Sequence, residues 1–170
     1  NEAVRRDLQQ EGPRSDWVFW LDADDLMAPD AFLGLQAALT ADPHLDAVWG
    51  TISCFRGQEP PRIRSGQEYP ADYADLIHME PTKTLQSGFF VRAAIAQREP
   101  WNEDMDAGED FEMYLRLWKQ YRCKKVQTVF MHNRRGMHST GPRAATGRDW
   151  RRAVEAMLVR AQREETRAQR

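Results

Sequence analysis

The chain has 170 residues, of which 41% are hydrophobic and 10% aromatic, which fits one folded domain with a sizeable core. Its 24 Lys and Arg residues against 26 Asp and Glu residues leave a formal net charge of −2, which excludes a strongly basic nucleic-acid-binding domain. The apolar runs are far shorter than the roughly 20 residues of a membrane helix, and the polar residues at the start of the sequence lead us to expect no secretory signal.

Apolar periodicity and helix-breaking residues divide the chain into alternating strands and helices. In the first half we expect the end of a helix over 1–10, a strand buried on both faces over 17–21, a helix from Pro29 to Leu39, a strand over 47–55, a loop over 56–70 and a short helix over 71–79. In the second half we expect a strand ending at 89–91, a short helix through Ile95, a polar loop over 101–107, a helix over 108–120, a strand over 125–131, a loop over 132–148 and a C-terminal helix over about 149–165. This alternation predicts an α/β fold with a mostly parallel sheet flanked by helices, in a single domain over 1–170.

The two cysteines bear on the redox environment. Cys54 and Cys123 lie far apart in the sequence and match no metal-binding spacing. Two free thiols in a cytoplasmic protein are the simplest interpretation.

The apolar segment 17–21 is followed by three carboxylates within four positions, Asp22, Asp24 and Asp25. A buried carboxylate is costly unless a cation or hydrogen bonds offset its desolvation, and ligands of α/β sheets bind beyond the carboxyl ends of strands. We therefore expect one of Asp22 and Asp24 to bind Mg²⁺ or Mn²⁺ on a phosphorylated ligand, and the other to accept hydrogen bonds from a sugar hydroxyl. The alternative is a solvated acidic turn that caps the next helix.

A second acidic cluster, Gly108-Glu109-Asp110, opens the amphipathic helix predicted over 108–120. Carboxylates at a helix N-terminus are stabilised by the helix dipole, so capping is one interpretation. A carboxylate at a helix tip also suits a general base that takes a proton from a hydroxyl. We expect the two acidic clusters to face one another across a shared cleft.

Two other interpretations of the first cluster agree less well with its neighbours. A phosphatase-like site uses the first Asp as nucleophile and usually has a Thr soon after it, but no Thr follows before Thr40. A calcium-binding loop needs Gly where this chain has Met27.

Three motifs in this order resemble family 2 glycosyltransferases of the GT-A fold: WVFWLDADD at 17–25, SGFF at 87–90 and GEDFEMYLRL at 108–117. The two acidic motifs lie roughly 85 residues apart, and the resemblance covers about 1–140. It implies a GT-A-like, Rossmann-like fold and an inverting, metal-dependent transfer of a sugar from a nucleotide-diphosphate sugar to an acceptor hydroxyl. Bacterial polysaccharide biosynthesis, on a glycan or lipid-linked acceptor, is the setting that it implies, in the cytoplasm or peripheral to the inner face of the membrane.

The resemblance also implies roles for the acidic residues. Asp22 is expected to hydrogen-bond the ribose or sugar of the donor, Asp24 to bind Mn²⁺ or Mg²⁺ at the diphosphate, and Asp25 to assist in donor binding. Asp110 is expected to be the general base, with Glu109 holding acceptor hydroxyls. Gly88 is expected to let the backbone approach the donor or the acceptor. Trp101 is expected to stack on an acceptor sugar, or else to be a core or lid aromatic.

The loop predicted over 132–148 contains His132, Arg134, Arg135 and His138. In members of this fold a loop placed there often supplies a late metal ligand or contacts to the diphosphate. We therefore expect His132 or His138 to bind the metal, and Arg134 or Arg135 to pair with phosphate oxygens. A solvated basic loop is the alternative.

The first strand of the family, which grips the nucleotide base, has no counterpart in the sequence. A fragment is the simplest explanation, in which case base recognition lies outside it and a free sheet edge is expected to pair in a homo-oligomer. A non-catalytic scaffold or assembly module that keeps the GT-A-like fold is therefore the alternative to an enzyme.

Overall fold

The computed structural model of the chain describes residues 16–135 and 143–168. The strands are β1 (Trp17–Trp20), β2 (Leu26–Met27), β3 (Ala47–Phe55), β4 (Arg62–Ile63), β5 (Phe89–Arg92) and β6 (Cys123–Arg134). The helices are α2 (Ala31–Ala41), α3 (Tyr73–Leu76), α4 (Pro81–Thr84), α5 (Ala93–Arg98), α6 (Glu109–Gln120) and α7 (Arg143–Ala168). None of the helices within the described ranges is both long and apolar enough to cross a membrane.

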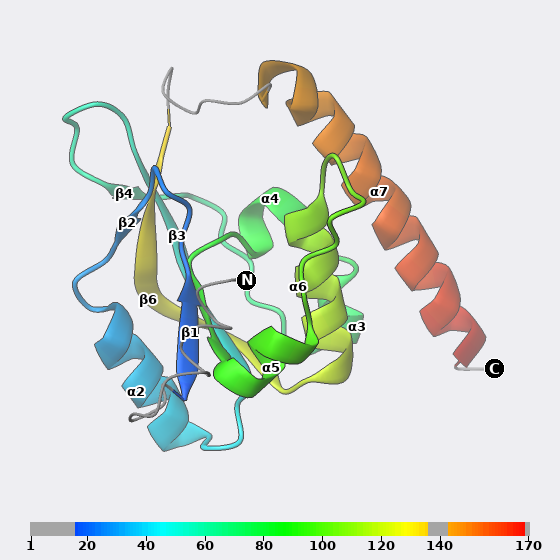
Figure 1. Ribbon diagram of the computed structural model, residues 1–170, viewed down its shortest axis with the longest axis horizontal. Helices are drawn as coiled ribbons and strands as arrows, with labels where there is room; N and C mark the ends of the chain where they lie inside the picture. Colours follow the sequence, from blue (N-terminus) through cyan, green and yellow to red (C-terminus); the bar gives the residue numbers. More distant parts are fainter. Residues whose placement is uncertain (1–15, 136–142, 169–170) are drawn as a thin grey trace.

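The strands form one curled sheet in the order β1-β5-β3-β6-β2, with β4 paired to the outer part of β3 (Figure 1). Strands β1, β3 and β6 run in the same direction, while β5 lies antiparallel between β1 and β3. The α/β fold class is confirmed, but the sheet is mixed rather than mostly parallel. The reason is that β5 begins beside the end of β1, where the Gly88 N–H donates to the Trp20 carbonyl, and then runs back along β1.

Strand β1 differs from the central, doubly buried strand that its apolar sequence predicts. Within the described residues it pairs with β5 alone, at one end of the sheet, and its four residues are half-buried. An aromatic strand in this position covers its neighbours with large rings: Phe19 packs on Phe90 with ring centroids 4.5 Å apart.

Helices cover both faces of the sheet (Figure 1). Helix α2 packs its small and branched residues, Ala31, Leu35 and Ala38, on one face. On the other face lie α5, α6 and α7, over a core in which the Trp49 and Phe89 rings stack at 4.5 Å. Tyr114 of α6 meets both rings edge-on, which anchors the helix to the sheet.

The boundaries of the elements follow the sequence closely where the apolar pattern is long. Strand β3 has the predicted bounds, and α6 begins directly after Gly108. Strand β6 continues to Arg134 and α7 begins at Arg143, so the loop predicted over 132–148 is shorter at both ends. The two-residue strands β2 and β4 and the one-turn helix α4 have no periodic pattern that could have revealed them. The helix predicted over 1–10 lies outside the described residues.

A buried lysine fastens the long segment between β3 and β5 to the sheet. Lys125 of β6 is 5% exposed, and its ammonium donates to Gln67 Oε1 at 2.8 Å, to the Glu68 carbonyl at 2.9 Å and to the Lys83 carbonyl at 3.1 Å. Its three donors are thus matched by three acceptors, and the charge also lies 4.7 Å from the centre of the Tyr69 ring. Burial lowers the pKa of Lys125 to about 8.

The lowered pKa of Lys125 predicts that folding stability rises with pH in the alkaline range. Between a folded pKa of about 8 and an unfolded pKa of 10.5 the unfolded chain holds the proton more tightly, so deprotonation favours the folded state. We expect the free energy of unfolding, measured with urea at pH 7 and pH 9.5, to show this increase. In Lys125→Met the increase should disappear; an equal increase in the variant would contradict the assignment to Lys125.

Candidate active site

The turn after β1 presents the first acidic cluster at the edge of the sheet where β1, β3 and β6 end. Asp22 lies at this edge, and Ser87, which precedes β5, donates its hydroxyl hydrogen to Asp22 Oδ2 at 2.9 Å. The Gly88 N–H donates to the Trp20 carbonyl at 2.8 Å, which joins the end of β1 to the start of β5. Two segments 65 positions apart thus fix the place of one carboxylate.

Asp25 is the buried member of the cluster, with 6% of its surface exposed. The Asn133 side-chain amide donates to its two oxygens at 3.1 and 2.9 Å, and the Arg134 N–H donates to Oδ1 at 2.8 Å. Burial raises the pKa of Asp25, and these hydrogen bonds oppose that rise. Asp25 therefore anchors the acidic turn to the end of β6, and Asp22 and Asp24 are the more accessible carboxylates.

Asp110 lies at the start of α6, where Gly108 at φ +82° turns the chain into the helix. Its Oδ1 accepts hydrogen bonds from the Phe111 N–H at 2.7 Å and from the Trp150 indole N–H at 2.9 Å. Burial raises the pKa of Asp110, the two hydrogen bonds lower it, and the charges of Glu109 and Asp22 raise it further. A carboxylate with a raised pKa in a partly polar setting is a typical proton acceptor.

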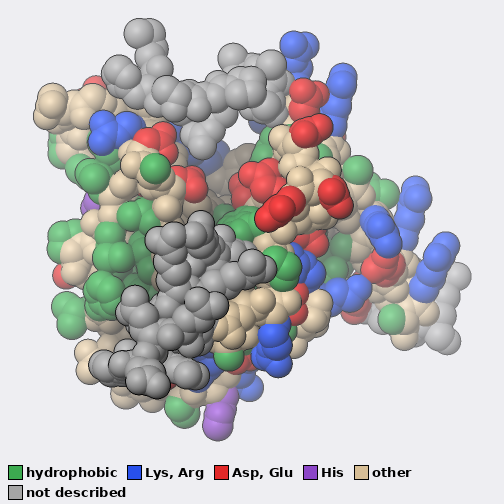
Figure 2. All heavy atoms as spheres, viewed as in Figure 1, with side chains coloured by type: hydrophobic (Ala, Val, Ile, Leu, Met, Phe, Trp, Pro, Cys, Tyr) green, Lys and Arg blue, Asp and Glu red, His purple; other side chains and the backbone are tan. Residues whose placement is uncertain are grey.

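The two acidic clusters lie within electrostatic reach of one another. The charge of Asp22 contributes to the raised pKa of Asp110 and also to that of Tyr114, which is buried in α6. Figure 2 shows acidic side chains on both sides of a hollow on this face of the molecule. Although Asp22 and Asp110 are 88 positions apart in the sequence, the fold places the charge of Asp22 near enough to contribute to the raised pKa of Asp110.

Gly88 and Trp101 both have structural reasons for their identity. Gly88 adopts φ +81°, and a Cβ on it would lie 2.4 Å from the Met131 Cβ, so the close approach of the turn before β5 to Met131 requires glycine there. Trp101 is half-buried and meets Trp20 edge-on at 5.6 Å, as a core or lid aromatic would.

The site residues that the sequence predicts at the end of β6 do not point to one common site. The His132 ring nitrogen lies 3.1 Å from the Ser53 hydroxyl, whereas the next residue, Asn133, points to the opposite face and holds Asp25. The structure therefore does not bring His132 to the carboxylates, and burial lowers its pKa. His138 lies outside the described residues.

The side chains of Arg134 and Arg135 also lie in different surroundings. The Arg134 Nε–H donates to the Asp24 carbonyl at 2.8 Å, and its guanidinium lies 4.9 Å from the centre of the Phe55 ring. This bond places a positive charge beside the acidic turn. Arg135 is exposed and lines a pocket at the end of β3.

Two residues of the site were not predicted from the sequence. Asn133 holds Asp25 across 108 positions, and no local pattern marks such a pairing. Trp150 looks like an ordinary apolar position of an amphipathic helix, yet its N–H reaches Asp110. The one available signal is that a buried Trp needs a hydrogen-bond acceptor, which the acidic start of α6 can provide.

Comparison with known families agrees with this arrangement. The profile of Glycosyl transferase family group 2 matches residues 17–164, which include both acidic clusters and most of α7. The chain belongs to this family. No curated protein sequence matches it.

Solved structures of S. aureus TarS share the fold of this glycosyltransferase family 2 chain. The structure of TarS 1–349 is 18% identical with a TM-score of 0.55, over 79% of this chain and 38% of that one. The same TarS segment in complex with UDP is 17% identical with a TM-score of 0.54, over 80% of this chain and 39% of that one. This chain therefore spans well under half the length of the TarS structures that it matches.

The donor atoms in the acidic cluster suit a hard divalent cation. Among the described residues no group of three or more His, Cys, Asp or Glu side chains forms a cage for a metal ion. Mg²⁺, however, is usually bound by one or two carboxylates together with water and substrate phosphates rather than by such a cage. Asp24, with Asp22 two positions away at the end of β1, fits that second kind of site in a family 2 glycosyltransferase.

Proposed function

We propose that the chain is the transfer domain, or part of it, of an inverting glycosyltransferase that uses a nucleotide-diphosphate sugar. The observation that carries this proposal is the placement of Asp22 and Asp110 within electrostatic reach, in a chain of glycosyl transferase family group 2. The UDP bound to TarS, which has the same fold, supports a nucleoside diphosphate as the leaving group.

In the proposed reaction the acceptor hydroxyl attacks the anomeric carbon of the donor sugar. The new carbon–oxygen bond forms as the bond from that carbon to the diphosphate oxygen breaks, and Asp110 takes the hydroxyl proton. Its raised pKa and its place in the first turn of α6, opposite the first acidic cluster, suit Asp110 to this task. Glu109, in the same first turn of α6, would hold another acceptor hydroxyl.

The donor would lie at the other acidic cluster. Among the residues that the structure describes, the Asp22 carboxylate accepts one hydrogen bond, from Ser87, which leaves lone pairs for a ribose or sugar hydroxyl. Asp24 is the proposed metal ligand, and Arg134 beside it would add positive charge near the diphosphate. A divalent cation bound there would neutralise the charge that develops on the leaving diphosphate.

Calorimetric titration with UDP and with GDP, each with and without Mn²⁺, tests the donor part of this proposal. We expect binding that depends on Mn²⁺ and is lost in Asp24→Asn, with Asp30→Asn, an exposed carboxylate in the next turn, as the matched control. Equal binding with and without Mn²⁺ would overturn the metal-dependent mechanism. No nucleotide binding at all, together with no turnover, would favour the scaffold alternative.

Trp150→Phe is expected to shift the pH dependence of turnover. The indole hydrogen bond lowers the pKa of Asp110, so its removal raises that pKa and moves the acidic limb of the pH–rate profile to higher pH. The rate at acidic pH should therefore fall more than the rate at alkaline pH, because a larger share of Asp110 is protonated there.

Trp118→Phe is the matched control for this experiment. Trp118 is a buried tryptophan within α6 itself, and its indole nitrogen has no hydrogen-bond partner among the described residues. It should therefore leave the pH profile in place. A profile that is identical in the Trp150→Phe variant and the unchanged chain would show that Trp150 does not position Asp110.

A further inference from the structure

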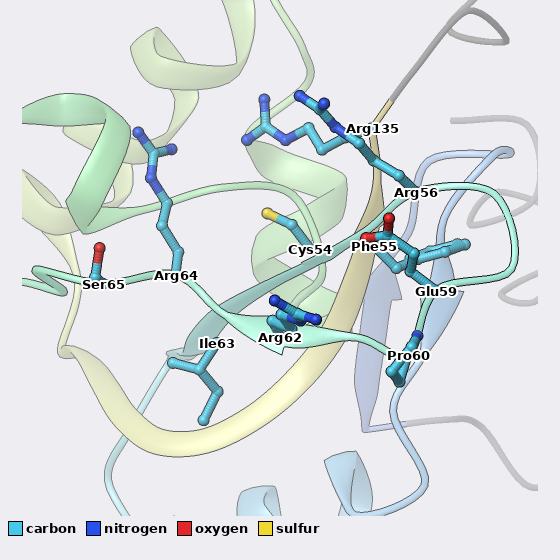
Figure 3. Close-up of a pocket in the computed structure, with 10 residues that line it drawn as sticks. All are labelled: Cys54, Phe55, Arg56, Glu59, Pro60, Arg62, Ile63, Arg64, Ser65 and Arg135. Carbon is cyan, nitrogen blue, oxygen red and sulfur yellow. The ribbon is translucent and has the colours of Figure 1, made fainter.

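An open pocket of about 460 Å³ lies at the ends of β3 and β6, against β4. Its walls carry four arginines, Arg56, Arg62, Arg64 and Arg135, and a single carboxylate, Glu59 (Figure 3). We call this feature the arginine pocket. Its volume lies in the range of pockets that bind small molecules.

The arginines come from three separate segments of the chain, and Arg56 and Arg135 lie side by side (Figure 3). Arg62 lies in β4 directly opposite Cys54 of β3, and Arg64 follows two residues later, so both point to the same face. Arg135 follows the end of β6, where its N–H donates to the Phe55 carbonyl at 2.8 Å, which places it beside Arg56. The fold therefore gathers positive charge that the sequence spreads over 80 positions.

Little within the protein balances this charge. Among residues 16–135 and 143–168, the guanidinium groups of Arg56, Arg62 and Arg135 form no hydrogen bond or ion pair, and Arg64 donates to the neutral Thr82 hydroxyl at 3.0 Å. Like charges placed side by side across neighbouring strands destabilise a sheet. A bound anion would remove that repulsion, and the planar donor forks of arginine match the oxygens of phosphate.

The arginine pocket adjoins the acidic turn. Cys54, in its wall, pairs with Asn133 of β6, and Asn133 holds Asp25. Phe55, which also lines the pocket, lies under the Arg134 guanidinium, and Arg134 donates to the Asp24 carbonyl. The arginine pocket and the acidic turn are thus joined through neighbouring residues of β3 and β6.

We propose that the arginine pocket binds a phosphate group carried by a ligand of the candidate active site. The phosphate belongs either to the diphosphate of the donor or to a phosphorylated acceptor. The pocket volume leaves room for the phosphate and for the unit to which it is attached.

Inorganic tripolyphosphate, titrated calorimetrically into the whole 170-residue chain, is the probe. We expect R62Q/R135Q to bind it at least about tenfold more weakly, since a charged hydrogen bond contributes about 1.5–3 kcal/mol. R98Q, an exposed arginine of α5, is the matched control and should bind as the unchanged chain does. Equal affinity in R62Q/R135Q, R98Q and the unchanged chain would overturn the proposal.

Removal of the Glu59 carboxylate should strengthen anion binding, which is a result that misfolding would not produce. E59Q should bind tripolyphosphate about two- to fivefold more tightly, because one nearby like charge is removed from the anion site. Weaker or unchanged binding in E59Q would count against the arginine pocket as the place where the anion binds.

A competition arm identifies the source of the phosphate. Displacement of tripolyphosphate by UDP, with weaker UDP binding in R62Q/R135Q, supports the donor diphosphate. Simultaneous binding of both supports a phosphorylated acceptor. Neither measurement requires turnover, so this proposal and the proposed glycosyl transfer can fail separately.

Discussion

Asp110→Asn is expected to abolish most sugar transfer while leaving nucleotide binding intact. Asparagine keeps the shape of the side chain and can still accept the Trp150 and Phe111 hydrogen bonds, but it cannot accept the acceptor proton. General-base catalysis contributes about 10²–10⁴-fold in rate, so turnover should fall by that factor. The measurement is release of nucleoside diphosphate under single-donor conditions, with the Kd of the nucleotide determined in parallel.

Asp106→Asn is the matched control, because Asp106 is an exposed carboxylate in the loop just before α6. It should retain full turnover. A normal rate in the Asp110→Asn variant would remove the proposed mechanism, whereas a fall that came entirely from weaker nucleotide binding would move Asp110 from the base to the donor site.

The raised pKa of Asp110 predicts how turnover depends on pH. The pKa of Asp110 is raised by burial and by the charges of Glu109 and Asp22, so the base is protonated, and inactive, at pH values where an ordinary aspartate is already ionised. Turnover should therefore rise with pH through a midpoint above the usual range of Asp.

Gly88→Ala is expected to lower the free energy of unfolding more than Gly57→Ala does. Left-handed backbone costs a non-glycine residue about 1–2 kcal/mol, and φ at Gly88 is +81°. The added Cβ would also lie 2.4 Å from the Met131 Cβ, and overpacking in a core costs about 1–3 kcal/mol. The free energy of unfolding in urea should therefore fall by about 2–5 kcal/mol.

Gly57→Ala separates the two contributions. Gly57 has φ +53°, but a Cβ there would meet nothing within 4 Å, so only the backbone cost should remain. Equal losses in the two variants would show that the contact with Met131 is relieved by movement of its side chain. That result would remove the packing reason for glycine in the turn before β5.

The sequence predicts the elements whose patterns are local. Strand β3 and helix α6 each have a long apolar pattern and definite ends, and the structure has them where they were expected. The direction and position of β5 could not be predicted, because nothing in Phe89–Arg92 says that it pairs between β1 and β3. The same apolar run in Trp17–Trp20 suits a central strand or an aromatic strand at one end of the sheet, so burial on both faces was wrong.

The candidate site likewise contains some residues that the sequence predicts and others that only the fold reveals. Asp22, Asp24 and Asp110 stand out as charges next to apolar elements, so the sequence alone marks them as candidates. Their partners do not stand out, because Asn133 and Trp150 act through contacts between segments that only the fold brings together. The histidine prediction at the end of β6 depended on a loop beginning at 132, whereas the strand continues to Arg134 and turns His132 toward Ser53.

The hydrogen bond between Asp25 and Asn133 has a consequence for how the protein is made. It joins positions 108 residues apart, and Asn133 belongs to the final strand of the sheet. Chains grow from the N-terminus on the ribosome, so the acidic turn emerges early but cannot reach its final shape until that strand has emerged too. The edge of the sheet that carries the acidic turn should thus be among the last regions to mature in the nascent chain.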